Sequence, residues 1–238
     1  MSDTRVTYRR LSGPRRGVRS WWGKAWQRAV EEAAYADGDL KRGRSFARSD
    51  QVGAITVDAG SVLAAVRDGD DAWTVQVAVP VLDASAAQAL AEVVAATSGR
   101  VVQLLGGDLP HDLVEHAEEA GVELLPYGGE FTCTCTCDHY LDPCPHALAV
   151  LTQLGWLVDD EPLVLFALRG LPRDDLLARV GALTRPAEPS DGPGDDDGRS
   201  DPVSVAALAD DVELAVDAAL RARALLASFG APAEADGI

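Results

Sequence analysis

The first clear periodicity of apolar residues begins at Trp21 and is helical. The apolar positions that recur at this spacing are Trp22, Trp26, Ala29, Val30 and Ala33. Apolar side chains three and four residues apart fall on one face of an α-helix. The pattern therefore predicts a helix of about three turns that starts at Trp21, ends near Gly38 and packs its apolar stripe against a core.

Short valine-rich runs replace the helical pattern in the next segment. They cover residues 54–57, 62–66 and 73–79, and the turns between them contain Gly60 and Gly69 next to aspartates. Valine favours strands, whereas Gly and Asp favour tight turns. These runs therefore predict an antiparallel meander of three strands.

Beyond the meander, the pattern predicts further helices and one more strand. The expected elements are a helix from Asp83 or Ser85 to Thr97, a strand at residues 101–105, a helix at 110–120 and an apolar helix at 146–156. A capping side chain before the first of these helices, and Gly121 after the helix at 110–120, support the boundaries.

The two ends of the chain lack this core pattern. Residues 1–20 are rich in arginine and contain Gly13 and Pro14, which disfavour a helix. Residues 184–202 are acidic and rich in Pro and Gly, a composition that buries too little apolar surface to fold. We therefore expect a flexible basic arm (1–20), a disordered acidic linker (184–202) and a separate C-terminal helix (203–230).

Together, these elements predict an α+β fold. A small antiparallel sheet with packed helices is expected in residues 21–128. Residues 129–183 contain all four cysteines of the chain, which are typical ligands of structural zinc, and are expected to form a zinc-stapled finger and the helices that follow it. We find no internal repeat.

All the cysteines of the chain lie between Cys133 and Cys144, and a histidine follows at His146. Thiolates and imidazole are the ligands of structural zinc, whose tetrahedral shell is closed by four protein groups. Cys144 and His146 complete such a shell with either Cys135 and Cys137 or Cys133 and Cys135. A closed shell leaves no position for a substrate, so we expect structural Zn²⁺ and no enzymatic activity.

The cysteine usage also bears on the compartment. No apolar run approaches the roughly 18 residues needed to cross a bilayer, and the arginine-rich start is not followed by the apolar core of a signal peptide. Reducing cytosol keeps thiols free to bind a metal. We therefore expect a cytoplasmic protein that does not associate with membranes.

Charge is spread unevenly along the chain. The formal net charge is −17, but residues 1–50 carry twelve of the 21 Lys and Arg and only six acidic residues. A basic segment on an acidic body can contact a phosphate backbone or an acidic partner through that segment alone. The candidate nucleic-acid contacts are Arg15, Arg16, Arg19, Lys24, Lys41, Arg42, Arg44 and Arg48. Trp22 and Trp26 are expected to pack on the body rather than to stack on bases.

The spacing C-x-C-x₆-C-x-H from Cys135 to His146 resembles the SWIM-type zinc finger. Further similarity to bacterial, uncharacterised members of this family lies at Pro143, residues 160–170, residues 21–26 (WWGKAW) and residues 41–48 (KRGRSFAR). The resemblance covers residues 20–183. It favours Cys135, Cys137, Cys144 and His146 as the ligands, because a spacer of six residues is the one that this family uses.

The resemblance implies two kinds of function. SWIM domains occur within or beside helicase-like ATPases of the Swi/Snf class, and in transposase-like and ubiquitin-related proteins. This points to a zinc-binding adaptor that mediates protein interaction, an accessory to such an ATPase. The alternative is direct binding of DNA or another nucleic acid through the finger and the basic N-terminal arm. The acidic body favours the adaptor.

Overall fold

The computed structural model describes residues 5–11 and 17–185. Their sheet has five antiparallel strands in the order of the sequence, from β1 to β5. The strands are β1 (Val6–Tyr8), β2 (Val52–Asp58), β3 (Ser61–Asp68), β4 (Asp71–Ala78) and β5 (Thr132–Cys135). The predicted meander is confirmed in β2, β3 and β4. Gly60 and Gly69 turn the chain between these strands with φ of 68° and 63°, a conformation that glycine adopts without strain.

The first strand corrects one prediction. Residues 1–20 were expected to be a flexible arm, but Val6–Tyr8 pairs with β2, so that Thr7 lies opposite Thr56. The hydroxyl oxygens of these two threonines are 3.0 Å apart. Three residues are too few for a periodic signal, and the open edge of β2 supplies the partner that makes them a strand. The remainder of the predicted arm lies partly outside the described residues.

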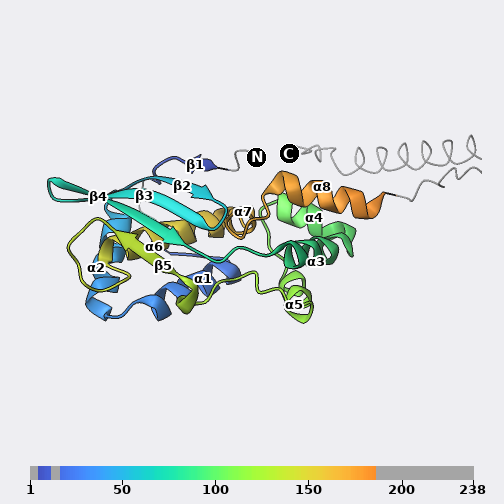
Figure 1. Cartoon of the computed structure of the whole chain (residues 1–238), viewed down its shortest axis with the longest axis horizontal. Coiled ribbons are helices and arrows are strands. Elements are labelled where there is room, and N and C mark those ends of the chain that lie inside the picture. The colour runs from blue at the N-terminus through green and yellow to red at the C-terminus, as the bar shows by residue number, and fades with distance from the viewer. Residues whose placement is uncertain (1–4, 12–16, 186–238) are drawn as a thin grey trace, which may run out of the picture. The chain divides into compact units, whose positions relative to one another are not determined.

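The helices fall into two groups (Figure 1). On one side of the sheet lie α1 (Trp21–Ala33), α2 (Asp37–Arg48) and α6 (Pro145–Asp160). Beyond the end of the sheet lie α3 (Ala84–Ala95), α4 (Ser98–Leu105), α5 (His111–Glu119) and α8 (Arg173–Thr184), with the short α7 (Leu163–Leu168) between the two groups. A single turn of 3₁₀ helix (Gly128–Glu130) leads into β5.

Helix α6 forms the centre of the core. Nearly all of its residues are buried, and it contacts α1, α2 and strands of the sheet. Gly155 lets α1 approach closely, because a Cβ there would lie 2.7 Å from Cδ1 of Trp26. Trp22 and Trp26 are 6% and 1% exposed, which confirms that they pack on the body. Their indole nitrogens donate to the carbonyls of Val158 and Leu151, both on α6.

The second prediction that the structure corrects is the strand at residues 101–105, which is helical in α4. Val-Val-Gln-Leu-Leu fits either state, and tertiary contacts decide between them. Arg100, 5% exposed, donates to the carbonyl of Val93 and to the carboxylate of Asp112, and so ties α4 to α3 and α5. Leu104 is buried on the same helical face, whereas Val102 is 71% exposed.

The other predicted helices are found with small shifts of their ends. The helix capped by Asp83 is α3, whose first turn donates from Ala86 N to the Asp83 carboxylate at 2.8 Å. The helix at 110–120 is α5, and the apolar helix at 146–156 is α6. Helix α2 was not expected, because its stretch of arginines and Gly43 gives only a weak apolar pattern.

Strand pairing and helix packing cross the domain boundary that was predicted at residue 128. Strand β5 pairs with β4, with Cys135 opposite Val75, and α6 packs on the sheet. The finger residues and the preceding segment therefore share one core, while the division at 128 stays a prediction. The predicted linker (184–202) lies outside the described residues except at its first two positions, and the predicted C-terminal helix (203–230) lies outside entirely.

The face of the sheet that α6 does not cover bears a mixture of apolar, polar and charged side chains, Arg67 and Asp58 among them. Leu63 is 48% exposed there, and Thr74, Gln76 and Thr134 from neighbouring strands are exposed beside it.

Among the described helices, none is long and apolar enough to span a membrane.

Candidate metal centre

Three backbone elements bring the cysteine and histidine side chains together. Cys135 is the last residue of β5, and Cys137 lies in the bend that follows it. Cys144 is the N-cap of α6, where its sulfur accepts a hydrogen bond from Ala147 N at 3.5 Å. Pro145 starts the helix, and His146 lies in the first turn. A strand end and a helix start thus hold both halves of the motif on rigid elements.

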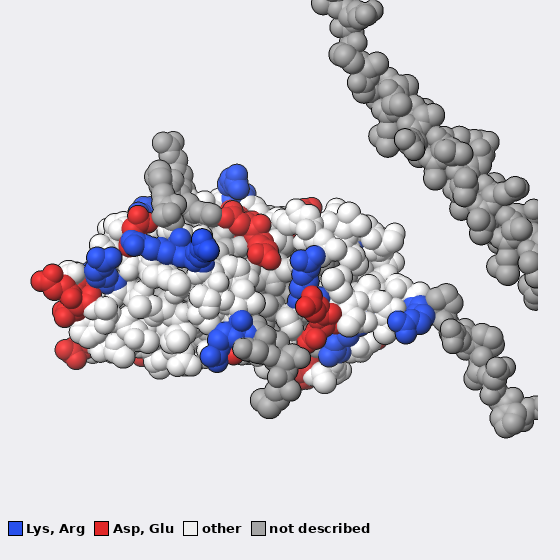
Figure 2. All heavy atoms as spheres, turned by 90° about the horizontal axis from the view of Figure 1, so that it is seen from above, with Lys and Arg blue, Asp and Glu red and all other residues white. Residues whose placement is uncertain are grey.

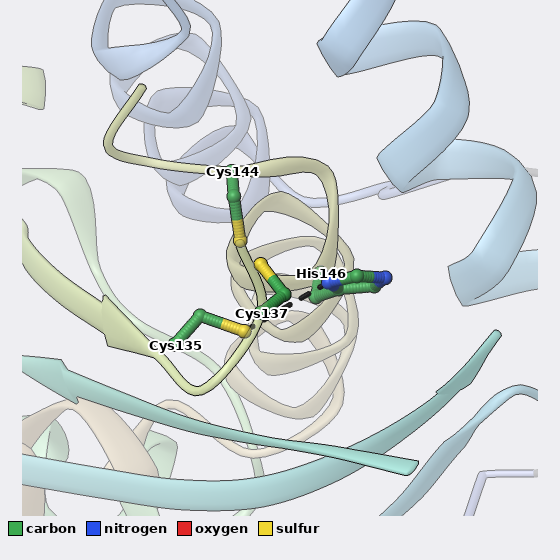
Figure 3. Close-up of side chains that lie close together, drawn as sticks. All are labelled: Cys135, Cys137, Cys144 and His146. Carbon is green, nitrogen blue, oxygen red and sulfur yellow. Dashed lines mark hydrogen bonds between the residues drawn. The ribbon is translucent and has the colours of Figure 1, made fainter. Parts of the chain in front are cut away.

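The ligand atoms of Cys135, Cys137, Cys144 and His146 all lie within 4.8 Å of one another. Figure 3 shows the three sulfur atoms and the imidazole turned toward a common point. Cys135 Sγ lies 3.8 Å from His146 Nδ1. Such a group has the donors and the spacing of a closed tetrahedral zinc shell.

Cys133 does not belong to this group. It is 4% exposed and lies opposite Val77 of β4, two residue pairs along the strand from Cys135. Burial raises the pKa of its thiol to about 12. All the cysteines are free. The pairing of Cys133 with Cys135, left open by the sequence, therefore has no support from the arrangement of the side chains.

The protein environment alone disfavours charged ligands. Burial raises the pKa of Cys135 to about 12 and also raises that of Cys144. Burial likewise lowers the pKa of His146, which favours the neutral ring that binds metals. A divalent cation supplies the positive charge that thiolates need in such surroundings. Soft sulfur donors with one imidazole fit Zn²⁺.

Around His146 the structure adds contacts that the sequence did not predict. The ring nitrogen Nε2 faces away from the sulfurs and lies 3.4 Å from Oδ2 of Asp68, the last residue of β3. The same carboxylate oxygen accepts a hydrogen bond from Arg42 Nη2 of α2 at 2.7 Å. Carboxylates in this position orient a metal-binding histidine and fix its tautomer.

Two aromatic rings enclose the imidazole. Phe46 stacks on it at a centroid distance of 5.3 Å with an interplanar angle of 27°, and Trp73 at 6.0 Å with 25°. These residues and Asp68 lie more than seventy residues from His146 along the chain. No local motif signals them, because the β3–β4 hairpin and α2 reach the site only through the tertiary fold.

The loop between Cys137 and Cys144 has its own anchor. His139 Nε2 lies 3.4 Å from Oδ1 of Asp39 in the first turn of α2, and Leu141 N donates to His139 Nδ1 at 3.2 Å. Tyr140 stacks on His139 but is 89% exposed. The loop is therefore fixed at its base and presents an aromatic side chain to solvent.

Four of the predicted nucleic-acid residues, Lys41, Arg42, Arg44 and Arg48, lie on α2, whereas Lys24 lies on α1 and Arg19 just before it. Arg19, Arg42 and Arg44 form ion pairs with Asp160, Asp68 and Glu31, respectively. Lys24, Lys41 and Arg48 are exposed. Arg15 and Arg16 lie outside the described residues. On the face seen in Figure 2, basic and acidic side chains are interspersed among uncharged ones.

Comparison with known proteins agrees with this metal centre. Residues 102–155 match the model of the SWIM zinc finger, from within α4 to near the end of α6. The chain is also 31% identical over 168 residues to the uncharacterized protein Rv2102 of Mycobacterium tuberculosis. That match covers 69% of this chain and 60% of the relative, so the chain spans less than two thirds of the relative's length. No solved structure matches.

Proposed function

We propose that this chain, which carries a SWIM zinc finger at residues 102–155, is a non-enzymatic adaptor whose finger is stapled by zinc. Cys135, Cys137, Cys144 and His146 hold Zn²⁺ in this proposal. Four protein ligands leave no open coordination position, so the metal supports structure rather than chemistry. The site ties the end of β5 to the start of α6, and thereby fixes the loop between them.

The observation that carries the adaptor proposal is the surface of that loop. Tyr140 is 89% exposed on a base fixed by His139, and the exposed Asp138 and Asp142 flank it. Tyrosine is enriched where protein interfaces concentrate their binding energy, because it buries a large area and loses few rotamers. The acidic neighbours disfavour a phosphate backbone at this position and suit a partner that presents basic groups.

The resemblance to SWIM domains suggests the partner class. We propose that the loop binds a helicase-like ATPase of the Swi/Snf class and that this binding takes place in the cytoplasm. The test is affinity purification of the zinc-loaded chain from its native cell, with the recovered ATPase quantified by mass spectrometry. Tyr140→Ala should reduce recovery about tenfold, as expected for an interfacial tyrosine worth more than 1 kcal/mol.

Tyr35→Ala is the matched control, because Tyr35 is 78% exposed but lies outside the zinc loop. It should recover the ATPase as well as the unmodified chain does. Purification without any such ATPase, or equal recovery with Tyr140→Ala, would count against the adaptor.

Direct nucleic-acid binding is the second candidate function. It is favoured by the exposed Lys24, Lys41 and Arg48, which form no ion pair within the described part of the chain. Logarithmic affinity for DNA should fall with the logarithm of salt concentration by about 0.7 to 0.9 per neutralised phosphate. Replacing Arg15 and Arg16 by Gln should flatten that slope. Deleting residues 1–20 is a poorer test, because it removes β1 as well.

A further inference from the structure

A cavity lies between helices α1, α2 and α6, and none of the candidate metal ligands lines it. Its volume is about 170 Å³. The residues that line it come from α1, α2, α6 and the segment before α1; they are Gly17, Val18, Trp26, Gln27, Val30, Arg44, Arg48, Thr152, Gly155 and Trp156. An apolar cavity of ~150 Å³ in another protein holds a benzene molecule. The space therefore suits one flat ring or a group of similar size.

One part of the cavity wall is apolar and firmly placed. Trp26 is 1% exposed and is held by the hydrogen bond from its Nε1 to the Leu151 carbonyl at 3.0 Å. Val30 lies one turn further along α1, also buried. Gly155 lacks the side chain that would otherwise collide with Trp26. Because the Trp26 and Val30 side chains are almost wholly covered by their neighbours, they form a rigid floor and present only a small apolar area to the cavity.

The opposite part of the wall is basic. Arg44 and Arg48 are one turn apart on α2, and both line the cavity. No Asp or Glu appears among its described lining residues, although the chain carries 38 acidic residues. Like charges at this spacing on a helix repel each other. An anion between the two guanidinium groups would relieve that repulsion.

A carboxylate outside the cavity holds one of the arginines in place. Glu31 accepts hydrogen bonds from Arg44 Nη2 and from Gln27 Nε2, the latter at 2.8 Å. These bonds lower the pKa of Glu31 and keep it charged. Arg48 forms no ion pair with any described residue. With two cations and one anion, this group carries a net charge of one positive unit, which a bound anion would balance.

We propose that this cavity binds a small organic anion, with its phosphate or carboxylate group on Arg44 and Arg48 and a single flat ring in the remaining space. Guanidinium groups bind such oxyanions through paired hydrogen bonds. The site is independent of the metal centre and of the adaptor surface at Tyr140. A phosphate of this kind has two sources: a free small phosphate ester, or the terminal phosphate of a nucleic-acid strand.

The test is titration of the zinc-loaded full chain with phenyl phosphate, benzoate and inorganic phosphate, followed by calorimetry and tryptophan fluorescence. Phenyl phosphate and benzoate should bind saturably with dissociation constants of roughly 1 mM or tighter, and more tightly than inorganic phosphate. Arg48→Gln should weaken phenyl phosphate about tenfold, the loss typical of one charge-assisted hydrogen bond. Arg48 is exposed, so its replacement should leave the fold intact.

The matched control is Arg67→Gln, which removes the same charge from an exposed position of β3 that does not line the cavity. The affinity of this control variant for phenyl phosphate should stay within about twofold of that of the unmodified chain, since distant surface charges are screened. Equal weakening by both replacements would overturn the proposal, because it would reveal general electrostatic attraction. Absence of saturable binding by both ring-bearing probes would overturn it as well.

A further pair of probes separates the two sources. A dinucleotide with a 5′-phosphate and the same dinucleotide with a 5′-hydroxyl are titrated against the unmodified chain and Arg48→Gln. Tighter binding of the phosphorylated form that depends on Arg48 assigns the site to strand ends. Saturable binding of phenyl phosphate with no such preference assigns it to free small phosphate esters. Both outcomes support the cavity as an anion site.

Discussion

Two regions of this molecule hold irregular backbone in place by different means. At the metal centre, four side chains from a twelve-residue stretch converge on one point, and no disulfide joins them. At the opposite end of β5, Arg169, which is 2% exposed, binds four separate partners. Its guanidinium donates to the carbonyls of Pro80, Glu123 and Leu124 and to the carboxylate of Glu130.

The comparison shows what each kind of connection requires. The arginine brings its own charge and five donors, so protein groups alone satisfy it. The thiols have raised pKa values in their buried positions and need an added cation to become ligands. The connection made by Arg169 is therefore permanent, whereas the connection at the metal centre depends on zinc. The predictions below test this difference.

Removal of the metal should have the largest effect. Zinc contributes about 10 to 16 kcal/mol of apparent free energy in small fingers. Chelation, or Cys144→Ser, should therefore unfold residues 132–160 at least, with loss of helical circular dichroism and of protection from hydrogen exchange. Mass spectrometry of the native protein should find one zinc per chain. An unchanged melting temperature after verified loss of zinc would show that the metal is not a structural staple.

Cys133→Ala is the control for this experiment, because Cys133 lies outside the ligand group. It should retain one zinc per chain and lose about 1 kcal/mol of stability from the small cavity. Loss of zinc in this variant would instead favour the pairing of Cys133 with Cys135.

Replacement of Arg169 should cause the next largest loss of stability. Arg169→Met leaves the Glu130 carboxylate, whose side chain is 13% exposed, without its counter-ion, and leaves three carbonyls without a donor. Breaking a buried ion pair from one side costs roughly 3 to 5 kcal/mol. Urea denaturation should show this loss, while the zinc content stays at one per chain. A matched control is Arg173→Met, four residues along the chain in α8, which should change stability by less than about 1 kcal/mol.

A smaller effect is expected for the carboxylate behind His146. Asp68→Asn removes the charge that faces His146 Nε2 at 3.4 Å. Outer-shell carboxylates of this kind are worth about 10- to 100-fold in metal affinity. Competition with a chromogenic chelator measures the change. Asp71→Asn, an exposed aspartate of the same hairpin, should leave zinc affinity unaltered; an equal loss there would point to general charge rather than orientation.

The smallest effect is expected for the arginine that holds this carboxylate. The Arg42 side chain is 57% exposed, so solvent screens its ion pair with Asp68. Arg42→Gln should weaken zinc binding by about two- to fivefold, within the range of exposed ion pairs. The same chelator competition checks this value. A loss as large as that of Asp68→Asn would mean that Arg42, and not the carboxylate alone, fixes the imidazole.

The metal centre and most of the local structure follow from the sequence by itself. The four predicted ligands lie within twelve residues, so their spacing indicates the site before any fold is known. The apolar stripe of α1 and the three strands of the meander also depend on contacts between near neighbours, whose periodicity is visible in the chain. Short-range order of this kind needs no knowledge of distant segments.

Tertiary structure alone decided the rest. Residues 101–105 suit a strand or a helix equally, and Arg100 selects the helix by reaching α3 and α5. Val6–Tyr8 becomes a strand only because β2 offers an open edge. Arg42 and Arg44 look alike in sequence, yet one serves the metal centre and the other lines a cavity. Their roles depend on segments far away in the chain, and no local pattern encodes which side of α2 will meet which neighbour.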